Sequence, residues 1–163
     1  MTIPRQLLHP RYWPTWLGVV CMFVLATLPQ RANYLIGCFL GDLFYRFAGR
    51  RRHIAATNLA LCFPELGEGE RRALLKQTMR NQGIGLMETL RTWFTPVERL
   101  GVTLELVGER YLDEAEGGVI VLGSHFTSID VGGALLGRRF PSDSFYRRQK
   151  NPVLEWLMSR ARG

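Results

Sequence analysis

The feature that most constrains the fold is an uncharged run, YWPTWLGVVCMFVLATLPQ, at residues 12–30. A helix needs roughly 20 apolar residues to cross the hydrocarbon core of a bilayer, and this run is about that long. Pro14 and Pro29 lie near its two ends, where a helix tolerates proline best. A second apolar block, interrupted only by Asp42, follows directly. We therefore expect a membrane-anchoring helix near the N-terminus.

Two other interpretations of the run stay open, namely a buried helix of a soluble protein and a cleaved signal peptide. Pro29, Gln30 and Arg31 make a poor cleavage site, because such sites consist of small residues. The second apolar block also follows immediately, which does not suit a signal peptide. The anchoring helix is the interpretation that fits most of these observations.

Basic residues gather near both ends of the chain, which has a formal net charge of +7. One cluster, RFAGRRRH at residues 46–53, directly follows the apolar region. Such a cluster attracts anionic lipid head groups, at about 1 kcal/mol per basic residue near the surface. Only Arg5 and Arg11 precede the apolar run, so the cluster is expected on the cytoplasmic side. No nucleic-acid recognition motif accompanies these charges, so we expect a membrane partner and no nucleic acid.

Helical patterns occupy the middle of the chain. Apolar residues follow helical spacing over residues 53–63, and Pro64 ends that helix. Residues 64–94 predict a long helix or two helices, because Gly83 and Gly85 weaken the centre and favour a kink or break.

The pattern then changes to strands that alternate with helices. Residues 102–108 alternate like an edge strand, and residues 118–123 (GVIVLG) form an apolar run typical of a strand buried on both faces. A helix is expected over residues 130–137, a short strand over 143–148 and a helix over 151–163. This order predicts an α/β fold with a mostly parallel sheet. Because only about three strands are visible, we expect the chain to be a piece of a longer protein.

A histidine and a carboxylate follow the apolar run at residues 118–123. His125 would lie at the carboxyl end of the predicted strand, where open α/β sheets bind ligands, and Asp130 in the first turn of the next helix. A carboxylate bonded to one imidazole nitrogen fixes the tautomer, so the pair can act as a general base on an alcohol. The spacing alone is a weak signal, and a packed histidine is the alternative. No second histidine lies near enough for a metal site.

The residues around this pair resemble a known family. H-x-x-x-x-[DE] after a buried strand is the signature of glycerolipid-type acyltransferases, and the wider chain is similar to the bacterial lipid A biosynthesis acyltransferases, which add lauroyl or myristoyl chains. The similar segments follow the family's order and are HPRYWPTWLG, RRHIAATNLALCFPELGEGER, GLMETLRTWF, GVIVLGSHFTSIDVGGALLG and FYRRQKNPVLEWLMSRARG.

The resemblance implies an enzyme of the bacterial inner membrane whose catalytic domain faces the cytoplasm. Members transfer an acyl chain from acyl carrier protein to a hydroxyl of the Kdo-bearing lipid A precursor, and no cofactor or metal is implied. Residues 1–48 would form the hydrophobic anchor region and residues 49–163 the N-terminal part of the catalytic domain. The family continues beyond Gly163, so weak activity or none is expected from this chain alone.

The resemblance also assigns roles to individual residues. His125 would be the general base and Asp130 its orienting partner. The segment YRRQKNP is similar to a second motif of the family, with Arg148 where many members have proline. The residues of this segment expected to bind substrate are Tyr146, Arg147, Arg148 and Asn151. Arg147 would contact an acceptor phosphate or brace the acidic partner, and a solvated basic loop is the alternative.

Two other functions stay open at this point. One is an acyltransferase of the same superfamily with another glycolipid or a glycerophospholipid as acceptor. The other is an inactive, truncated fragment associated with the membrane.

Overall fold

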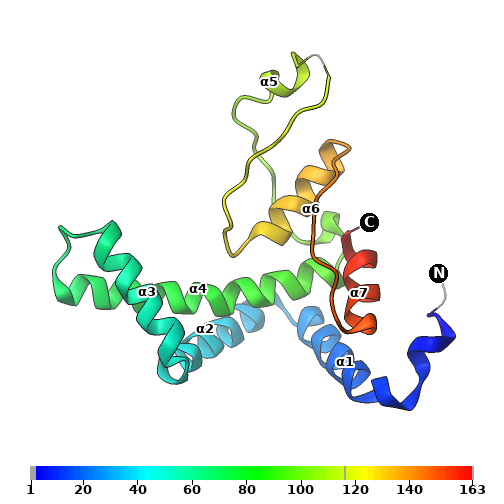
Figure 1. Cartoon of the computed structure of the whole chain (residues 1–163), viewed down its shortest axis with the longest axis horizontal. Coiled ribbons are helices and arrows are strands. Elements are labelled where there is room, and N and C mark those ends of the chain that lie inside the picture. Colours follow the sequence, from blue (N-terminus) through cyan, green and yellow to red (C-terminus); the bar gives the residue numbers. More distant parts are fainter. Residues whose placement is uncertain (1–2, 116, 163) are drawn as a thin grey trace.

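A computed structural model describes residues 3–115 and 117–162, and the described chain is built from helices around one long helix, α4 (Figure 1). The elements in chain order are η1 (Arg5–Leu8), η2 (Pro10–Tyr12), α1 (Trp13–Thr27), α2 (Gln30–Phe47), α3 (Gly49–Cys62), α4 (Glu68–Phe94), η3 (Val97–Arg99), α5 (Arg110–Asp113), α6 (Ile129–Arg139) and α7 (Pro152–Arg162). Helix α4 contacts α1, α2, α3, α6 and α7.

The uncharged run at residues 12–30 is divided between two helices. Helix α1 ends at Thr27, and Leu28 and Pro29 are extended, so that α2 starts in a new direction. At about 1.5 Å per residue, α1 spans roughly 22 Å, which is short of the ~30 Å hydrocarbon core. Helix α2 is longer but carries Arg31, Asp42 and Arg46. The predicted membrane-anchoring helix is therefore wrong for the described residues, since none of their helices is both long and apolar enough to cross a bilayer.

Helix α4 is continuous over 27 residues, so the predicted break at Gly83 and Gly85 is wrong. Its start is fixed locally, because the Gly67 N–H donates to Glu70 Oε2 at 2.8 Å and acidic residues suit the first turn of a helix. It ends at Phe94, two residues before Pro96, as the residue preceding a proline disfavours helical backbone.

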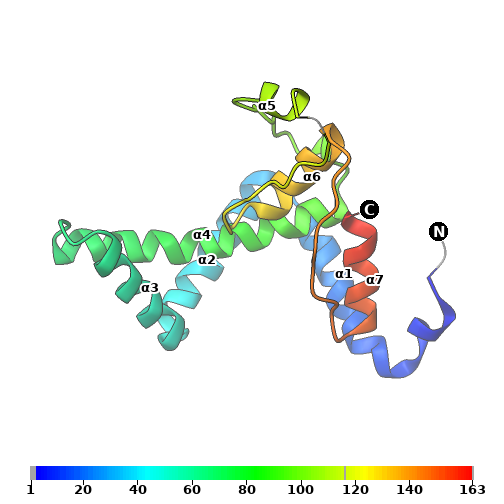
Figure 2. The same cartoon turned by 45° about the horizontal axis from the view of Figure 1, so that its top comes forward.

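The central glycines of α4 serve its packing against α2, which lies beside it and runs in the opposite direction (Figure 2). Gly37 and Gly41 of α2 face Gly83 of α4, and a Cβ added at Gly37 would lie 2.7 Å from the Cα of Ile84. Because these glycines have no side chain, the backbones of α2 and α4 can approach each other closely.

An ion pair joins α2 and α4 at the same crossing. Arg80 donates from Nε to Asp42 Oδ1 at 2.8 Å and from Nη2 to Oδ2 at 2.7 Å. This two-point hydrogen bond is the main reason that the pKa of Asp42 lies below its usual value. The pair fixes the register of the two helices, since both bonds form only in one alignment.

Two apolar clusters support the C-terminal half of α4. In the first, Leu7 and Val19 pack with Val153 and Leu157, so that α7 is held against α1. In the second, the buried side chains are Ala26, Met87 and Leu90. The core of the described chain therefore lies where α1, α4 and α7 meet.

The predicted α/β class is wrong, because residues 3–115 and 117–162 contain no strand and no sheet. A strand needs a neighbour to accept and donate its backbone hydrogen bonds, and no backbone bond joins residues 118–123 to another described segment. Ile120 and Leu122 are 95% and 98% exposed, which is the opposite of the predicted burial. The helices predicted near these segments are confirmed as α6 and α7.

Candidate active site

The described contacts place the start of α6 directly on α4. A Cβ added at Gly85 of α4 would lie 2.6 Å from the Cβ of Thr127, so the glycine allows the loop before α6 to approach the helix. Ser128 precedes the first turn of α6, and Asp130 lies within that turn. The location of Asp130 at a helix start agrees with the sequence-based prediction.

Asp130 is held by a side chain that the sequence did not single out. Thr89 lies one helical turn after Gly85, and its Oγ1 donates to Asp130 Oδ2 at 3.3 Å. Asp130 is half-buried, and its negative charge is favoured at the N-terminus of α6. In the sequence, a threonine one turn after a helical glycine is only weak evidence for a site residue. The role of Thr89 follows from the packing of α6 on α4.

His125 lies in the irregular segment that leads into α6, where the Phe126 N–H donates to the Ser124 carbonyl at 3.0 Å, and its side chain is exposed. Within residues 3–115 and 117–162, the imidazole makes no hydrogen bond. An exposed neutral imidazole can accept a proton from an incoming hydroxyl, and a nearby carboxylate stabilises the imidazolium that forms. The structure thus places the two residues on either side of the start of α6, and their catalytic roles stay predictions.

The second motif, at residues 146–151, is attached to α7 through Glu155. Tyr146 donates its hydroxyl to Glu155 Oε1 at 2.8 Å, the Gln149 N–H donates to Oε2 at 2.7 Å, and Arg148 Nε lies 3.6 Å from Oε1. The bond from Gln149, followed by that from Tyr146, is the main reason that the pKa of Glu155 is lowered. Glu155 is a structural residue that sequence reasoning missed.

The side chain of Asn151 makes hydrogen bonds that hold the start of α7 in place. Its Oδ1 accepts a hydrogen bond from the Val153 N–H at 3.0 Å, and its Nδ2 donates to Thr15 Oγ1 at 3.0 Å, which joins the start of α7 to α1. Arg147 is exposed. The substrate-binding roles of Tyr146, Arg147, Arg148 and Asn151 were not tested by these contacts and stay predictions.

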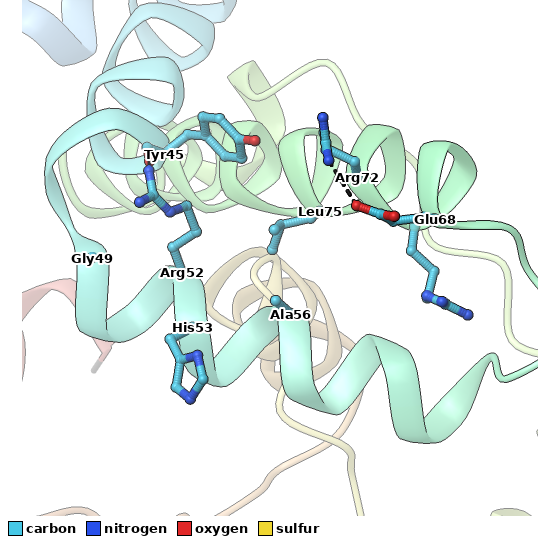
Figure 3. A pocket seen from close by; sticks show the side chains of 9 residues that line it. Tyr45, Gly49, Arg52, His53, Ala56, Glu68, Arg72 and Leu75 are labelled. Carbon is cyan, nitrogen blue, oxygen red and sulfur yellow. Dashed lines mark hydrogen bonds and ion pairs between the residues drawn. The ribbon is translucent and has the colours of Figure 1, made fainter.

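Two pockets in the described part of the chain lie apart from the His–Asp pair. One pocket lies between α3 and α4 (Figure 3), and a smaller one is lined by Leu104, Leu135 and Arg138 among others. Neither is lined by His125 or Asp130. Among the residues that the structure describes, no group of three or more His, Cys, Asp and Glu side chains could hold a metal ion.

Comparisons with known proteins agree with one another. The family described as bacterial lipid A biosynthesis acyltransferase matches residues 1–163. The lipid A biosynthesis lauroyltransferase of Escherichia coli K12 is 38% identical over 156 residues, which cover 94% of this chain and 51% of that protein. The palmitoleoyltransferase of the same strain is 35% identical over 161 residues, or 97% of this chain and 53% of the relative. A lipid A biosynthesis acyltransferase of Haemophilus influenzae is 35% identical over 158 residues, with coverages of 95% and 51%.

The chain spans about half the length of the curated relatives that it matches. No solved structure matches it.

Proposed function

Because the chain belongs to the bacterial lipid A biosynthesis acyltransferase family, we propose that the protein containing it transfers a fatty acyl chain to a hydroxyl of a lipid A precursor. The observation that carries this proposal is the family match over residues 1–163. The names of the relatives support it, since they include lauroyl, palmitoleoyl and myristoyl transferases of lipid A biosynthesis.

In the proposed reaction, acyl carrier protein supplies the acyl group as a thioester and the Kdo-bearing precursor supplies the hydroxyl. His125 removes the proton of that hydroxyl while its oxygen attacks the thioester carbonyl. The resulting oxyanion collapses, the thiolate leaves, and the imidazolium returns the proton to it. Asp130 stabilises the imidazolium in between, and the Thr89 hydroxyl limits the orientations that Asp130 can adopt.

Two features of the described residues support these roles. His125 is exposed, so a large lipid acceptor can reach it without opening of the structure. Asp130 lies in the first turn of an 11-residue helix and is bonded to α4, so the carboxylate has a defined position beside the segment that carries the base.

We place the proposed reaction at the cytoplasmic face of the bacterial inner membrane, with the membrane and acyl carrier protein as partners. The basic cluster at residues 46–53 supports this location, because it favours an anionic surface. Exposed apolar side chains on the first two helices support it as well, among them Leu17 and Phe39.

Mass spectrometry of lipid A tests the proposal. A bacterial strain that lacks its own secondary acyltransferases would express the complete reading frame containing this chain, alongside a His125→Ala variant. A matched control is His9→Ala, which removes another exposed histidine far from α6 along the chain. We expect a gain of one acyl chain with the wild type and with His9→Ala. Loss of a general base lowers such rates by roughly 10²–10⁴-fold, so His125→Ala should abolish the gain.

Each other outcome contradicts a defined part of the proposal. A gain that survives His125→Ala would refute the general-base role and leave lipid A as the acceptor. A gain in phospholipid mass without a change in lipid A would indicate a glycerophospholipid acceptor. No gain in either class from well-expressed protein would refute acyl transfer to lipid A.

A further inference from the structure

Helix α7 lies beside α1, although the two are far apart along the chain (Figure 1, Figure 2). Val153 and Leu157 of α7 pack with Val19 of α1 in one buried cluster. The rings of Trp16 and Trp156 meet edge to face, with their centres 5.7 Å apart. Part of the region expected to be an anchor, residues 1–48, therefore builds the same core as the helix that follows the second motif.

A side-chain hydrogen bond joins the second motif, residues 146–151, to α1. Asn151 Nδ2 donates to Thr15 Oγ1 at 3.0 Å, and the two residues are 136 positions apart. Thr15 lies in the first turn of α1, and both residues are half-buried. Because partial burial lowers the local dielectric, such a bond is stronger than one in open water. The contact can thus hold the Asn151 amide in one orientation.

The same side chain fixes the start of α7. Asn151 Oδ1 accepts from the Val153 N–H at 3.0 Å, and the Asn151 backbone carbonyl accepts from the Glu155 N–H at 3.0 Å. An asparagine that accepts from the second residue of a helix is an N-cap. The amide therefore cannot turn over without losing both the bond to Val153 and the bond to Thr15.

Glu155 extends this arrangement to the rest of the motif. From the first turn of α7, its carboxylate accepts from the Tyr146 hydroxyl at 2.8 Å and from the Gln149 N–H at 2.7 Å. The motif is thus held to α7 near one end by Glu155 and at the other by Asn151. Through Asn151, Thr15 acts on the position of the whole motif relative to α1.

The Asn151 amide keeps a donor that a ligand can use. Nδ2 carries two N–H groups, and the bond to Thr15 uses one of them. The described residues supply no acceptor to the other. Since Thr15 and Val153 fix the plane of the amide, the second N–H also has a fixed direction. A donor with a fixed direction loses less entropy when a ligand oxygen binds to it.

We propose that Thr15 is a positioning residue for substrate binding, because it holds the Asn151 amide so that the second Nδ2 N–H donates to an oxygen of the lipid A precursor. The inference rests on the proposed function and deepens it. Thr15 itself contacts no substrate. Helix α1 becomes part of the substrate-binding unit through this one side chain.

Steady-state kinetics of the complete protein test this role. In Thr15→Val a methyl group replaces the hydroxyl at nearly the same volume, and Thr15→Ser keeps the hydroxyl. Thr27→Val is the matched control, since it makes the same change at the other end of α1, where the Thr27 hydroxyl donates to the Val24 carbonyl of its own helix at 2.8 Å. The buried apolar cluster between α1 and α7 is unaltered in all three variants, so each should fold.

The assay varies the lipid A precursor at saturating acyl donor, and then the acyl donor at saturating precursor. One hydrogen bond changes binding by roughly two- to tenfold, so KM for the precursor should rise about fivefold in Thr15→Val. The values of kcat and of KM for the donor should stay within about twofold of wild type. Thr15→Ser and Thr27→Val should keep the wild-type KM. General damage to the fold would instead lower the amount of active enzyme, and so kcat.

A double-mutant cycle shows whether Thr15 acts through Asn151. The precursor KM of Thr15→Val/Asn151→Ala should equal that of Asn151→Ala, because the amide that Thr15 holds is already absent. Additive increases in KM would overturn the proposal. An unchanged precursor KM in Thr15→Val would also overturn it, as would a fall in kcat with KM unchanged.

Hydrogen exchange separates this inference from the proposed function, since it needs no substrate. Thr15→Val should speed exchange at the Val153 N–H, and Thr27→Val should leave it unchanged. Wild-type exchange at Val153 in Thr15→Val would overturn the positioning role whatever the substrate is. If the wild type does not acylate lipid A but exchange is faster in Thr15→Val, the proposed function fails and the control of Asn151 by Thr15 stands.

Discussion

Replacing Gly83 with alanine tests whether the α2–α4 crossing depends on close contact between backbones. A Cβ at position 83 would lie 2.6 Å from the Gly41 nitrogen and 3.1 Å from the Gly41 Cα. Both are backbone atoms of α2, so they cannot rotate away as a flexible side chain would. The two helices must therefore separate to admit the methyl group.

The expected magnitude follows from two opposing terms. Alanine is favoured over glycine in a helix interior by about 1 kcal/mol. Overpacking costs about 1–3 kcal/mol, and the upper end applies because the colliding atoms belong to the backbone. The difference is a net loss of about 2 kcal/mol in the free energy of unfolding. Gly18→Ala in α1 is the matched control, since a Cβ at Gly18 would meet nothing within 4 Å.

Urea denaturation followed by circular dichroism measures both variants. With a typical m-value of about 2 kcal/mol per M, the midpoint of Gly83→Ala should fall by about 1 M. The midpoint of Gly18→Ala should rise by up to about 0.5 M, since only the helix propensity changes. A Gly83→Ala midpoint at or above that of the wild type would refute the reasoning.

Three further predictions concern side-chain contacts. Because the bond to Arg80 lowers the pKa of Asp42 below its usual 3.8, the stability that it adds is present above pH 3.8 and is lost as the pH falls through the lower folded value. Urea midpoints of wild type and Asp42→Asn should therefore differ at pH 6 and converge once the pH has fallen below the lowered pKa of Asp42; a constant difference would contradict this. Glu155→Gln should speed hydrogen exchange and proteolysis at residues 146–149, with the far-ultraviolet circular dichroism unchanged, and unaltered exchange there would show that the Glu155 contacts do not hold this segment. Thr89→Val should slow acyl transfer by the complete protein roughly tenfold and alter its pH profile, because Asp130 loses a hydrogen bond, whereas Thr89→Ser should keep the wild-type profile.

Helix ends were predictable wherever the local sequence determines them. Pro64 lies just beyond α3, and Pro96 lies just beyond α4, as expected from the restrictions that proline places on the backbone. The position of Asp130 in the first turn of α6 was predictable for a similar reason, since the polar residues before it mark a helix start.

Contacts between distant segments were not predictable in the same way. In an isolated helix, Gly83 would lower helix stability. It serves as a packing site because Gly37 and Gly41 of α2 lie opposite it. Thr89 became part of the candidate site because α6 folds back on α4. These roles depend on which helix lies opposite, and a single sequence does not specify that.

The apolar run at residues 118–123 is the largest difference between expectation and structure. Its composition suits a buried strand, but burial requires neighbouring strands on both sides. The described residues supply none, so the run forms no strand and stays exposed. The predicted strand is wrong because the pattern of one segment does not show whether a neighbouring strand is present to pair with it.

This exposed run has a practical consequence for work on the chain in solution. Ile120 and Leu122 present their side chains to water, and the amides and carbonyls around them are free to pair. Such a segment can align with the same segment of another molecule and begin intermolecular β-aggregation. A purified sample should therefore gain β-signal and light scattering as its concentration rises, and a lysine in place of Ile120 should delay both.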